Sequence, residues 1–178
     1  MADAATQSHS SEQSVGDAAT AGLYLTFTLG NEVYGLEILT VQEIIGMMNV
    51  TKMPRTPQFV RGVINLRGKV IPVMDLRLKF GMDAQDDTDL TCIIVVKVNK
   101  GDESITVGII VDAVSEVVDI AADQIEPRPA FGTSVDTDFI LGMGKIGEKV
   151  VMLLDVSRVL TSNELELISD VGDKGEAM

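Results

Sequence analysis

An all-β fold of the barrel class, with two similar lobes, is predicted by three features of this 178-residue sequence. Short runs of Val, Ile and Leu recur at regular spacing with turn residues between them, and helical periodicity is scarce. The segment 62–76 returns at 142–156, a shift of 142 − 62 = 80 positions, with Gly, Lys, Val and Asp in the same places. The segment 34–45 returns at 107–118, a shift of 107 − 34 = 73. Two repeats in one order indicate a duplication, although short strands can also look alike by chance.

The first hairpin is predicted over Leu23–Leu29 and Glu32–Leu36, because the residues alternate and Gly30-Asn31 is a turn signal. The segment from Ile38 to Ile45 fits either a short helix or a strand. We favour a strand over Val41–Ile44, since β-branched residues pack well on a pleated surface. In a regular strand Val41 and Glu43 share one face, and Gln42 and Ile44 share the other.

The second hairpin is predicted over Gly62–Leu66 and Val70–Met74, with its turn at Arg67-Gly68-Lys69. Pro54 and Pro57 punctuate the loop before it. Pro72 cannot donate a ladder hydrogen bond, so its strand is expected to be an edge strand or to carry a bulge. The acidic stretch 83–89 is expected to connect the two lobes.

The second half of the chain repeats this organisation. Further strands are predicted, with Val114–Ile120 continuing the sheet of the two before it: Leu90–Asn99, Ser104–Val111, Val114–Ile120, Ile140–Ile146 and Lys149–Leu154. Asp155–Leu160 is expected to form one helical turn. Thr161 with Glu164 fits a capping box, which predicts a short helix to about Ser169. The predicted organisation is therefore a disordered tail over 1–21, one domain over 22–169 with lobes at roughly 29–80 and 90–160, and a flexible tail over 170–178.

Composition limits the class of protein. Apolar residues make up 46% of the chain and aromatic residues only 4%, so Val, Ile, Leu and Met must fill the core. There is no run of about 18–20 apolar residues and no signal peptide, so membrane insertion is not expected. The single cysteine, Cys92, cannot form an internal disulfide. These features predict a cytoplasmic location.

Charge is distributed unevenly along the chain. The net charge of −13 argues against binding to nucleic acid, whose phosphates would repel the protein. The segment 52–79 nevertheless holds seven Lys or Arg against one acid, Asp75. This segment is either a basic docking face or a set of solvated strand positions.

No catalytic, cofactor or metal site is predicted. The pattern Gly142-x-Gly-x-x-Gly147 precedes a strand, whereas a dinucleotide site needs a helix there. The only histidine, His9, lies in the tail, and Cys92 lies in an apolar strand where it fits a small core residue. The acids of 83–89 lack the spacing of a calcium loop. A binding role is therefore favoured; the alternative is a β-barrel that binds small ligands, catalyses a reaction or binds peptides.

The motifs of this chain resemble the CheW family of chemotaxis coupling proteins. The resemblance rests on Asn65-Leu66-Arg67-Gly68, Tyr34-Gly35, Val41-Gln42-Glu43-Ile44 and the segment 107–112, and it runs from about 23 to 168. It implies two five-stranded SH3-like barrels around a shared core, with no enzymatic activity and no cofactor. It also implies an adaptor, recruited to membrane receptor arrays, between the cytoplasmic tip of methyl-accepting receptors and the regulatory domain of the kinase CheA.

The resemblance also implies a receptor-binding site. Its residues would be Ile38, Val41, Glu43, Arg61, Gly62, Arg67, Cys92 and Ile93. Ile38, Val41 and Ile93 would bury an apolar helix end. Glu43 and Arg67 would set the register of that helix through charge-assisted hydrogen bonds. Gly62 would allow close approach of the receptor backbone. The kinase would contact exposed apolar strand ends of the two barrels.

Overall fold

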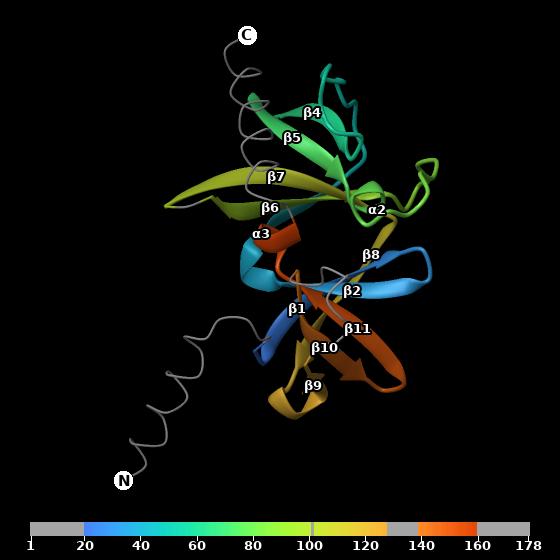
Figure 1. Cartoon of the computed structure of the whole chain (residues 1–178), viewed down its shortest axis with the longest axis vertical. Coiled ribbons are helices and arrows are strands. Elements are labelled where there is room, and N and C mark those ends of the chain that lie inside the picture. Colours follow the sequence, from blue (N-terminus) through green and yellow to red (C-terminus); the bar gives the residue numbers. More distant parts are fainter. Residues whose placement is uncertain (1–19, 101, 128–138, 160–178) are drawn as a thin grey trace.

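Two β-sheets make up the computed structural model, which describes residues 20–100, 102–127 and 139–159 (Figure 1). The five-stranded sheet has the order β3-β6-β7-β5-β4 and the six-stranded sheet the order β8-β1-β2-β11-β10-β9. The five-stranded sheet contains β3 (Val41–Gly46), β4 (Val60–Leu66), β5 (Lys69–Asp75), β6 (Cys92–Lys100) and β7 (Glu103–Val111). The six-stranded sheet contains β1 (Gly22–Leu29), β2 (Glu32–Glu37), β8 (Ala113–Ile120), β9 (Ile125–Glu126), β10 (Ile140–Ile146) and β11 (Lys149–Leu154). The helical pieces are η1 (Ile38–Thr40), α2 (Leu76–Lys79), η2 (Ala122–Gln124) and α3 (Val156–Val159).

The predicted hairpins are confirmed: β1 pairs with β2, β4 with β5, β6 with β7 and β10 with β11. The strand preference over 41–44 is also confirmed, with η1 just before it. The helical turn after Asp155 is present as α3. The predicted helix over 161–169 and both predicted tails lie largely or wholly outside the described residues.

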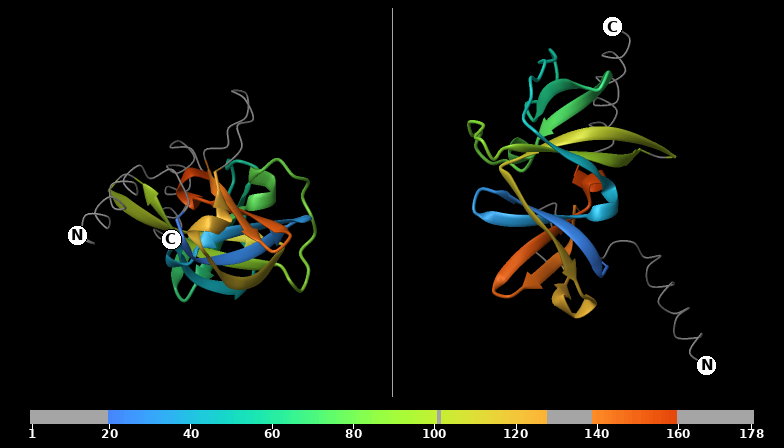
Figure 2. Two further views of the ribbon diagram at one scale, coloured as in Figure 1. Left: turned by 90° about the horizontal axis from the view of Figure 1, so that it is seen from below. Right: turned by 180° about the vertical axis from the view of Figure 1, so that it is seen from behind.

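The lobes exchange strands, and this corrects the predicted lobe boundaries. After the β1–β2 hairpin the chain crosses to β3 in the five-stranded sheet, and after the β6–β7 hairpin it crosses back to β8 in the six-stranded sheet (Figure 2). The first lobe is therefore β3–β7, and the second combines β1 and β2 with β8–β11. The prediction of lobes at 29–80 and 90–160, with 114–120 beside its preceding hairpin, is wrong. A strand's alternation is the same in either sheet, so the pattern of residues cannot reveal which sheet it joins.

The repeated segments occupy equivalent places in the two lobes. The 80-residue shift carries β4 and β5 onto β10 and β11, and the 73-residue shift carries β2 and β3 onto β7 and β8. The parallel pairs β5–β7 and β11–β2 correspond, and so do the hydrogen bonds Asp75 N to Phe59 O (2.6 Å) and Asp155 N to Phe139 O (2.9 Å). This agreement confirms the prediction of two similar lobes.

Each lobe differs in detail from the predicted five-stranded barrel. In the five-stranded sheet the segment after β3 reaches the edge strand β4 through an isolated bridge, Thr51 to Val63. The second lobe has a sixth, two-residue strand, β9, at the corresponding edge of β10. Pro72 does not mark an edge strand, since β5 lies between β7 and β4; the parallel ladder to β7 begins only at Val73.

The main core lies between the two sheets. It combines Leu25, Phe27 and Leu36 of the six-stranded sheet with Ile94 and Val96 of the five-stranded sheet. The opposite face of the five-stranded sheet buries its own cluster, which we call the outer cluster: Ile64, Ile71, Val73, Ile93, Val95 and Ile110. The first part of β6, residues 93–96, is therefore buried on both faces, which explains the apolar run there.

Candidate functional site

A β-bulge at Gln42 decides which way the side chains of β3 point. Val41 pairs with Val96, but Glu43 pairs with Val95 because the register shifts between them. Val41 accordingly packs on the main core, as Val96 does, whereas Glu43 takes the opposite face with Val95. The prediction that Val41 and Glu43 share a face is wrong, because the extra residue of a bulge reverses the alternation. No feature of the short motif revealed the bulge.

The bulge also turns Ile44 towards the main core. Ile44 pairs with Ile94 of that core, yet its side chain is 42% exposed. Its counterpart 73 residues later is Val117 on β8, which pairs with Leu25 and is 47% exposed. Neither residue was among the predicted site residues, although the 73-residue repeat relates them.

We call the apolar side chains on this side of the two crossing strands the crossover surface. Strands β3 and β8 lie on the same face of the molecule, as both views in Figure 2 show. Half-buried side chains here pack on the main core and leave part of their surface to solvent. The crossover surface consists of Val41 and Ile44 of β3 and Val114 and Val117 of β8, and we include Ile38 of η1 and Cys92 of β6, which pack on the same main core. Three of the predicted site residues, Ile38, Val41 and Cys92, therefore pack against the same main core.

Ile93 does not belong to this surface. It has no exposed area and lies in the outer cluster, on the opposite face of β6 from its neighbour Cys92. The thiol of Cys92 donates to the carbonyl oxygen of Leu90 at 3.1 Å, and its side chain packs on the main core. Ile93 offers no surface to a partner, which corrects its predicted role as a lining residue.

Glu43 and Arg67 contact each other. Arg67 and Gly68 form the two-residue turn between β4 and β5 with φ of 54° and 86°, as expected for a type I′ turn. The side chain of Asn65 accepts the Gly68 N–H at 2.8 Å and holds the turn. The Arg67 guanidinium then reaches the carboxylate of Glu43 across the sheet edges. The acid and the guanidinium expected at the site are thus adjacent on the rim of β3.

Gly62 meets a need of the fold itself. Its φ is 141°, and a Cβ there would lie 2.0 Å from the carbonyl oxygen of Thr51. That carbonyl accepts the Val63 N–H at 2.9 Å, and the Thr51 N–H donates to Val63 O at 2.8 Å. The space that a receptor backbone was predicted to enter is therefore filled by Thr51.

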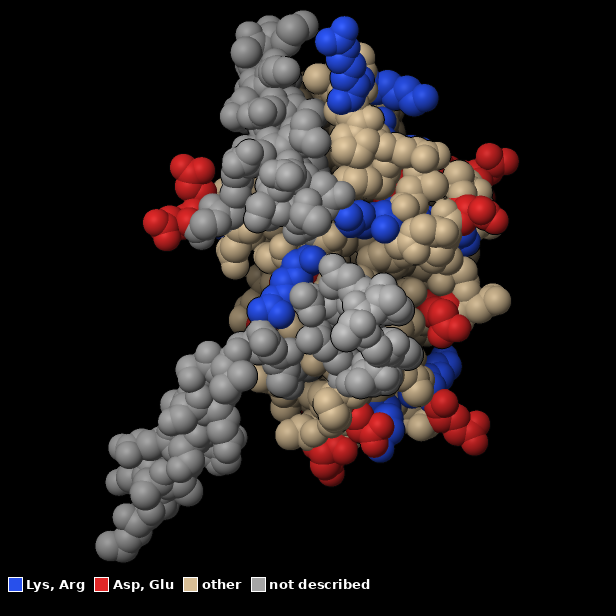
Figure 3. All heavy atoms as spheres, viewed as in Figure 1, with Lys and Arg blue, Asp and Glu red and all other residues tan. Residues whose placement is uncertain are grey.

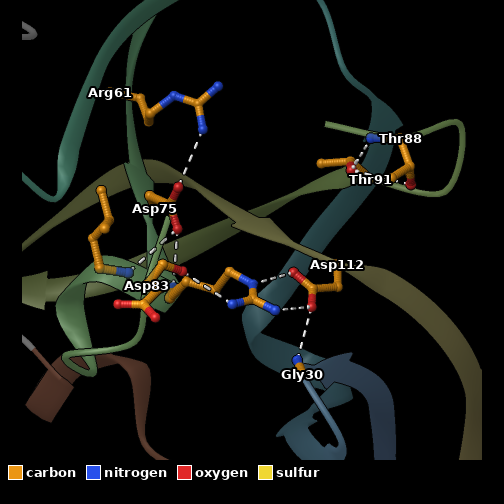
Figure 4. Close-up of polar contacts among 9 residues, drawn as sticks. Gly30, Arg61, Asp75, Asp83, Thr88, Thr91 and Asp112 are labelled. Atoms are coloured by element: carbon orange, nitrogen blue, oxygen red, sulfur yellow. Dashed lines mark hydrogen bonds and ion pairs between the residues drawn. The ribbon is translucent and has the colours of Figure 1, made fainter. Parts of the chain in front are cut away.

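Arg61 is engaged inside the chain as well. Its guanidinium lies 3.1 Å from Asp75 (Figure 4) and 3.2 Å from Asp87, so it holds the acidic connector against the five-stranded sheet. Asp75 also caps α2 by accepting the N–H groups of Arg77 (3.0 Å) and Leu78 (3.4 Å). Arg61 is a structural residue at this corner.

The basic segment is smaller on the surface than its sequence suggests. Arg61 is ion-paired, Arg77 pairs with Asp112, and the Lys79 ammonium lies 4.9 Å from the centroid of the Phe59 ring. The exposed basic residues at this end are Lys52, Arg55, Arg67 and Lys69. Figure 3 shows basic side chains at the end of the molecule where β4 and β5 lie.

The glycine-rich pattern at 142–147 forms β10 and its turn into β11, as predicted. Within the described ranges no group of three or more His, Cys, Asp or Glu could hold a metal ion. Across the same ranges we also find no helix long and apolar enough to span a bilayer.

Comparison with known proteins identifies the family. A family model described as a CheW-like domain matches residues 23–164. The chain belongs to the CheW-like family. It is 42% identical to the chemotaxis protein CheW of Klebsiella aerogenes, over 96% of this chain and 98% of that protein. It is 35% identical to the CheW of Helicobacter pylori, over 77% of this chain and 80% of that protein.

A solved CheW structure confirms the two-lobed all-β fold. The crystal structure of the scaffolding protein TtCheW from Thermoanaerobacter tengcongensis matches with a TM-score of 0.71 and 36% identity, over 82% of this chain and 96% of that one. The CheW resemblance predicted from the hairpin motifs is thereby confirmed.

Proposed function

We propose that this chain is a non-catalytic adaptor of bacterial chemotaxis. It couples the cytoplasmic tip of methyl-accepting receptors to the regulatory domain of the histidine kinase CheA, working in the cytoplasm and recruited to receptor arrays. Membership of the CheW-like family supports the general role, and the TtCheW relative is itself named a scaffolding protein. The crossover surface is the observation that carries the assignment of the receptor side.

The crossover surface suits the end of a helical rod. Ile44 and Val117 expose close to half of their side chains on two different strands, and Val41 and Val114 lie beside them. An amphipathic helix binds such a surface with residues spaced three and four apart. Covering one half-exposed Val or Ile contributes about 1 kcal/mol of hydrophobic free energy. We infer that these contacts supply most of the affinity for the receptor.

Polar contacts at the rim would set the alignment of the helix. Glu43 and Arg67 are already paired, at the β3 edge of the five-stranded sheet and on its face opposite Val41. A receptor helix that offers one acid and one base can exchange partners with this pair, forming charge-assisted hydrogen bonds of defined geometry. The five-stranded lobe that carries β3 is stabilised by the interior contacts of Arg61, Gly62 and Ile93.

A second apolar surface is available for the kinase domain. We call it the methionine rim: Ile45, Met47, Met48, Val50 and Leu66, all half-buried against the outer cluster. Methionine side chains adapt their shape to a partner. The rim lies on the opposite face of the five-stranded sheet from the crossover surface. An adaptor needs this separation in order to bind two partners at once.

A small-ligand or catalytic barrel is less well supported. The hollow of about 410 Å³ beside the acidic connector is lined by Arg61, Asp75 and Asp87, and these three are already paired with each other. The hollow of about 300 Å³ at the start of β1 is lined by Leu23, Ile38 and Leu39 among others and has a single charged side chain, Glu37. The other polar residues that line the larger hollow, Lys52, Gln58, Gln85 and Asp86, are all exposed, so neither hollow is an enclosed pocket in which buried polar groups converge on a ligand.

Reconstitution with receptor fragment and CheA tests the proposal. Adding the chain should raise kinase activity and recover both partners in a pull-down. Ile44→Asp and Val117→Asp should each weaken receptor capture while CheA capture is retained. Val150→Asp is the matched control, since Val150 is 49% exposed on a strand of the other hairpin. Kinase activity that does not depend on the chain would contradict the proposal.

A further inference from the structure

A charged contact joins the two lobes where β7 passes into β8. The carboxylate of Asp112 accepts from Arg77 through Nε at 2.8 Å and Nη2 at 3.0 Å (Figure 4). It also accepts the backbone N–H of Gly30 at 2.7 Å, and the Asp112 N–H donates to Thr28 O at 3.1 Å. We call Arg77, Asp112 and Gly30 the lobe clamp.

The three members of the lobe clamp come from three separate parts of the fold. Arg77 lies in α2, directly after β5 of the five-stranded sheet. Gly30 lies in the β1–β2 turn of the six-stranded sheet, and Asp112 is the residue at which the chain crosses between the sheets. The side chains of Arg77 and Asp112 are only 14% and 27% exposed. A bidentate pair shielded in this way is stronger than a pair in open solvent.

The repeat shows that the fold does not need this ion pair. Ser157 stands 80 residues after Arg77, in α3 of the other lobe, and its Oγ accepts the Asn99 N–H at 3.1 Å near the end of the β6–β7 hairpin. Leu39 stands 73 residues before Asp112, and it is 85% exposed. Among the described residues, the corresponding lobe-to-lobe contact is the neutral hydrogen bond from Asn99 to Ser157. The duplicated architecture therefore does not by itself account for the bidentate ion pair between Arg77 and Asp112.

The strands β3 and β8 are the two walls of the crossover surface, and the lobe clamp lies at the start of the β8 wall. Asp112 directly precedes β8, which carries Val114 and Val117. The other wall, β3, belongs to the five-stranded sheet to which Arg77 is attached. A partner helix about 10 Å across must touch both walls, and dispersion contacts are lost when a gap of even 1 Å opens.

We propose that the lobe clamp sets the distance between β3 and β8 and thereby preorganises the crossover surface for the receptor helix. Arg77 and Asp112 are positioning residues, which act on the receptor through the walls that they hold. The role in receptor binding rests on the function proposed above. The methionine rim belongs to one lobe only, so binding of the kinase domain is independent of the lobe clamp.

The test compares Arg77→Ala, Asp112→Asn and the conservative Arg77→Lys in the full chain. Lys145→Ala is the matched control, because its ion pair with Glu126 (3.1 Å) joins two strands of one sheet. Spin labels are attached to cysteines at two exposed positions, one in each lobe, through Lys69→Cys and Glu148→Cys. Cys92→Ser removes the native thiol, and the distance between the two labels then measures the distance between the lobes. Affinities for a receptor fragment and for the isolated CheA regulatory domain are measured on chains without labels.

Arg77→Ala and Asp112→Asn should broaden the lobe-to-lobe distance distribution and weaken receptor binding about tenfold, a coupling of about 1.4 kcal/mol. Affinity for the kinase domain should be unchanged, and Arg77→Lys should restore part of the receptor affinity. An unchanged distance distribution overturns the proposal, as does an equal loss of both affinities, which is what partial unfolding would cause. If the wild-type chain binds no receptor fragment, the proposed function fails and the distance measurement alone decides whether the lobe clamp sets the walls.

Discussion

Replacing Gly62 with Ala tests whether the contact between Thr51 and β4 holds the candidate site together. The new Cβ would lie 2.0 Å from the Thr51 carbonyl oxygen and 2.7 Å from its carbonyl carbon, far inside van der Waals contact. Both atoms are backbone, so no side chain can rotate away. Thr51 would have to withdraw, and the two hydrogen bonds that it exchanges with Val63 would break.

The expected cost has two parts. Holding Ala at a φ of 141° costs about 1–3 kcal/mol, because residues with a Cβ seldom adopt this conformation. Losing two backbone hydrogen bonds costs roughly another 1–3 kcal/mol. The free energy of unfolding should therefore fall by about 2–6 kcal/mol, a large share of the roughly 5–15 kcal/mol that stabilises a typical domain. With a urea m-value of about 2 kcal/mol/M, the midpoint should fall by roughly 1–3 M.

Urea denaturation followed by circular dichroism measures this change. Gly147→Ala is the control. Gly147 has a φ of 61° in the turn between β10 and β11, and a Cβ there meets nothing within 4 Å. That control should cost about 1–2 kcal/mol from backbone conformation alone. If the two variants shift the midpoint equally, Thr51 moves aside at no cost and the reasoning about Gly62 is refuted.

Three further outcomes are expected. Arg67→Glu should weaken receptor capture, because it places a second acid beside Glu43. The free energy of unfolding should change only by the amount typical of a surface ion pair, about 0–1 kcal/mol. Capture equal to wild type would exclude a role of Arg67 in recognition. Ile93→Ala should lower the free energy of unfolding by about 2–5 kcal/mol, because the side chain is fully buried, and a selective loss of receptor binding in the folded variant would contradict its placement in the outer cluster. Asp112→Asn should destabilise the protein at pH 7, and the destabilisation should shrink as the pH is lowered towards 3. Burial tends to raise the pKa of Asp112, but the hydrogen bonds from Arg77 and Gly30 and the Arg77 charge outweigh it, so the pKa lies below its ordinary value. The stabilisation is present above the unfolded-state pKa of about 3.9 and is lost as the pH falls through the lower folded-state pKa; urea midpoints that differ equally at both pH values would contradict this assignment.

The exchange of β3 and β8 has a mechanical consequence for an adaptor. Each lobe is completed by a strand that follows the hairpin of the other lobe, so neither sheet is complete without the other half of the chain. Separating the lobes would expose the main core and leave a sheet edge unpaired on each side. The crossover surface is built on β3 and β8, one in each sheet, so a change in the distance between the lobes changes the spacing of its side chains.

The two repeats and the four hairpins were readable from the sequence because their information is local. A turn such as Gly30-Asn31 or Arg67-Gly68 and the alternation beside it specify antiparallel neighbours over a few residues. The motifs around Arg67 and Glu43 were also enough to assign the family, and the structure places these two side chains in contact.

Tertiary structure alone decided the sheet that each crossing strand joins, the bulge at Gln42 and the neighbour of Gly62. Each of these depends on groups distant in the chain: Val95 and Val96 set the register of β3, Leu25 is opposite Val117, and Thr51 fills the space at Gly62. A strand carries the same alternation whichever partner it finds, so its sequence specifies a buried face but not the strand that covers it.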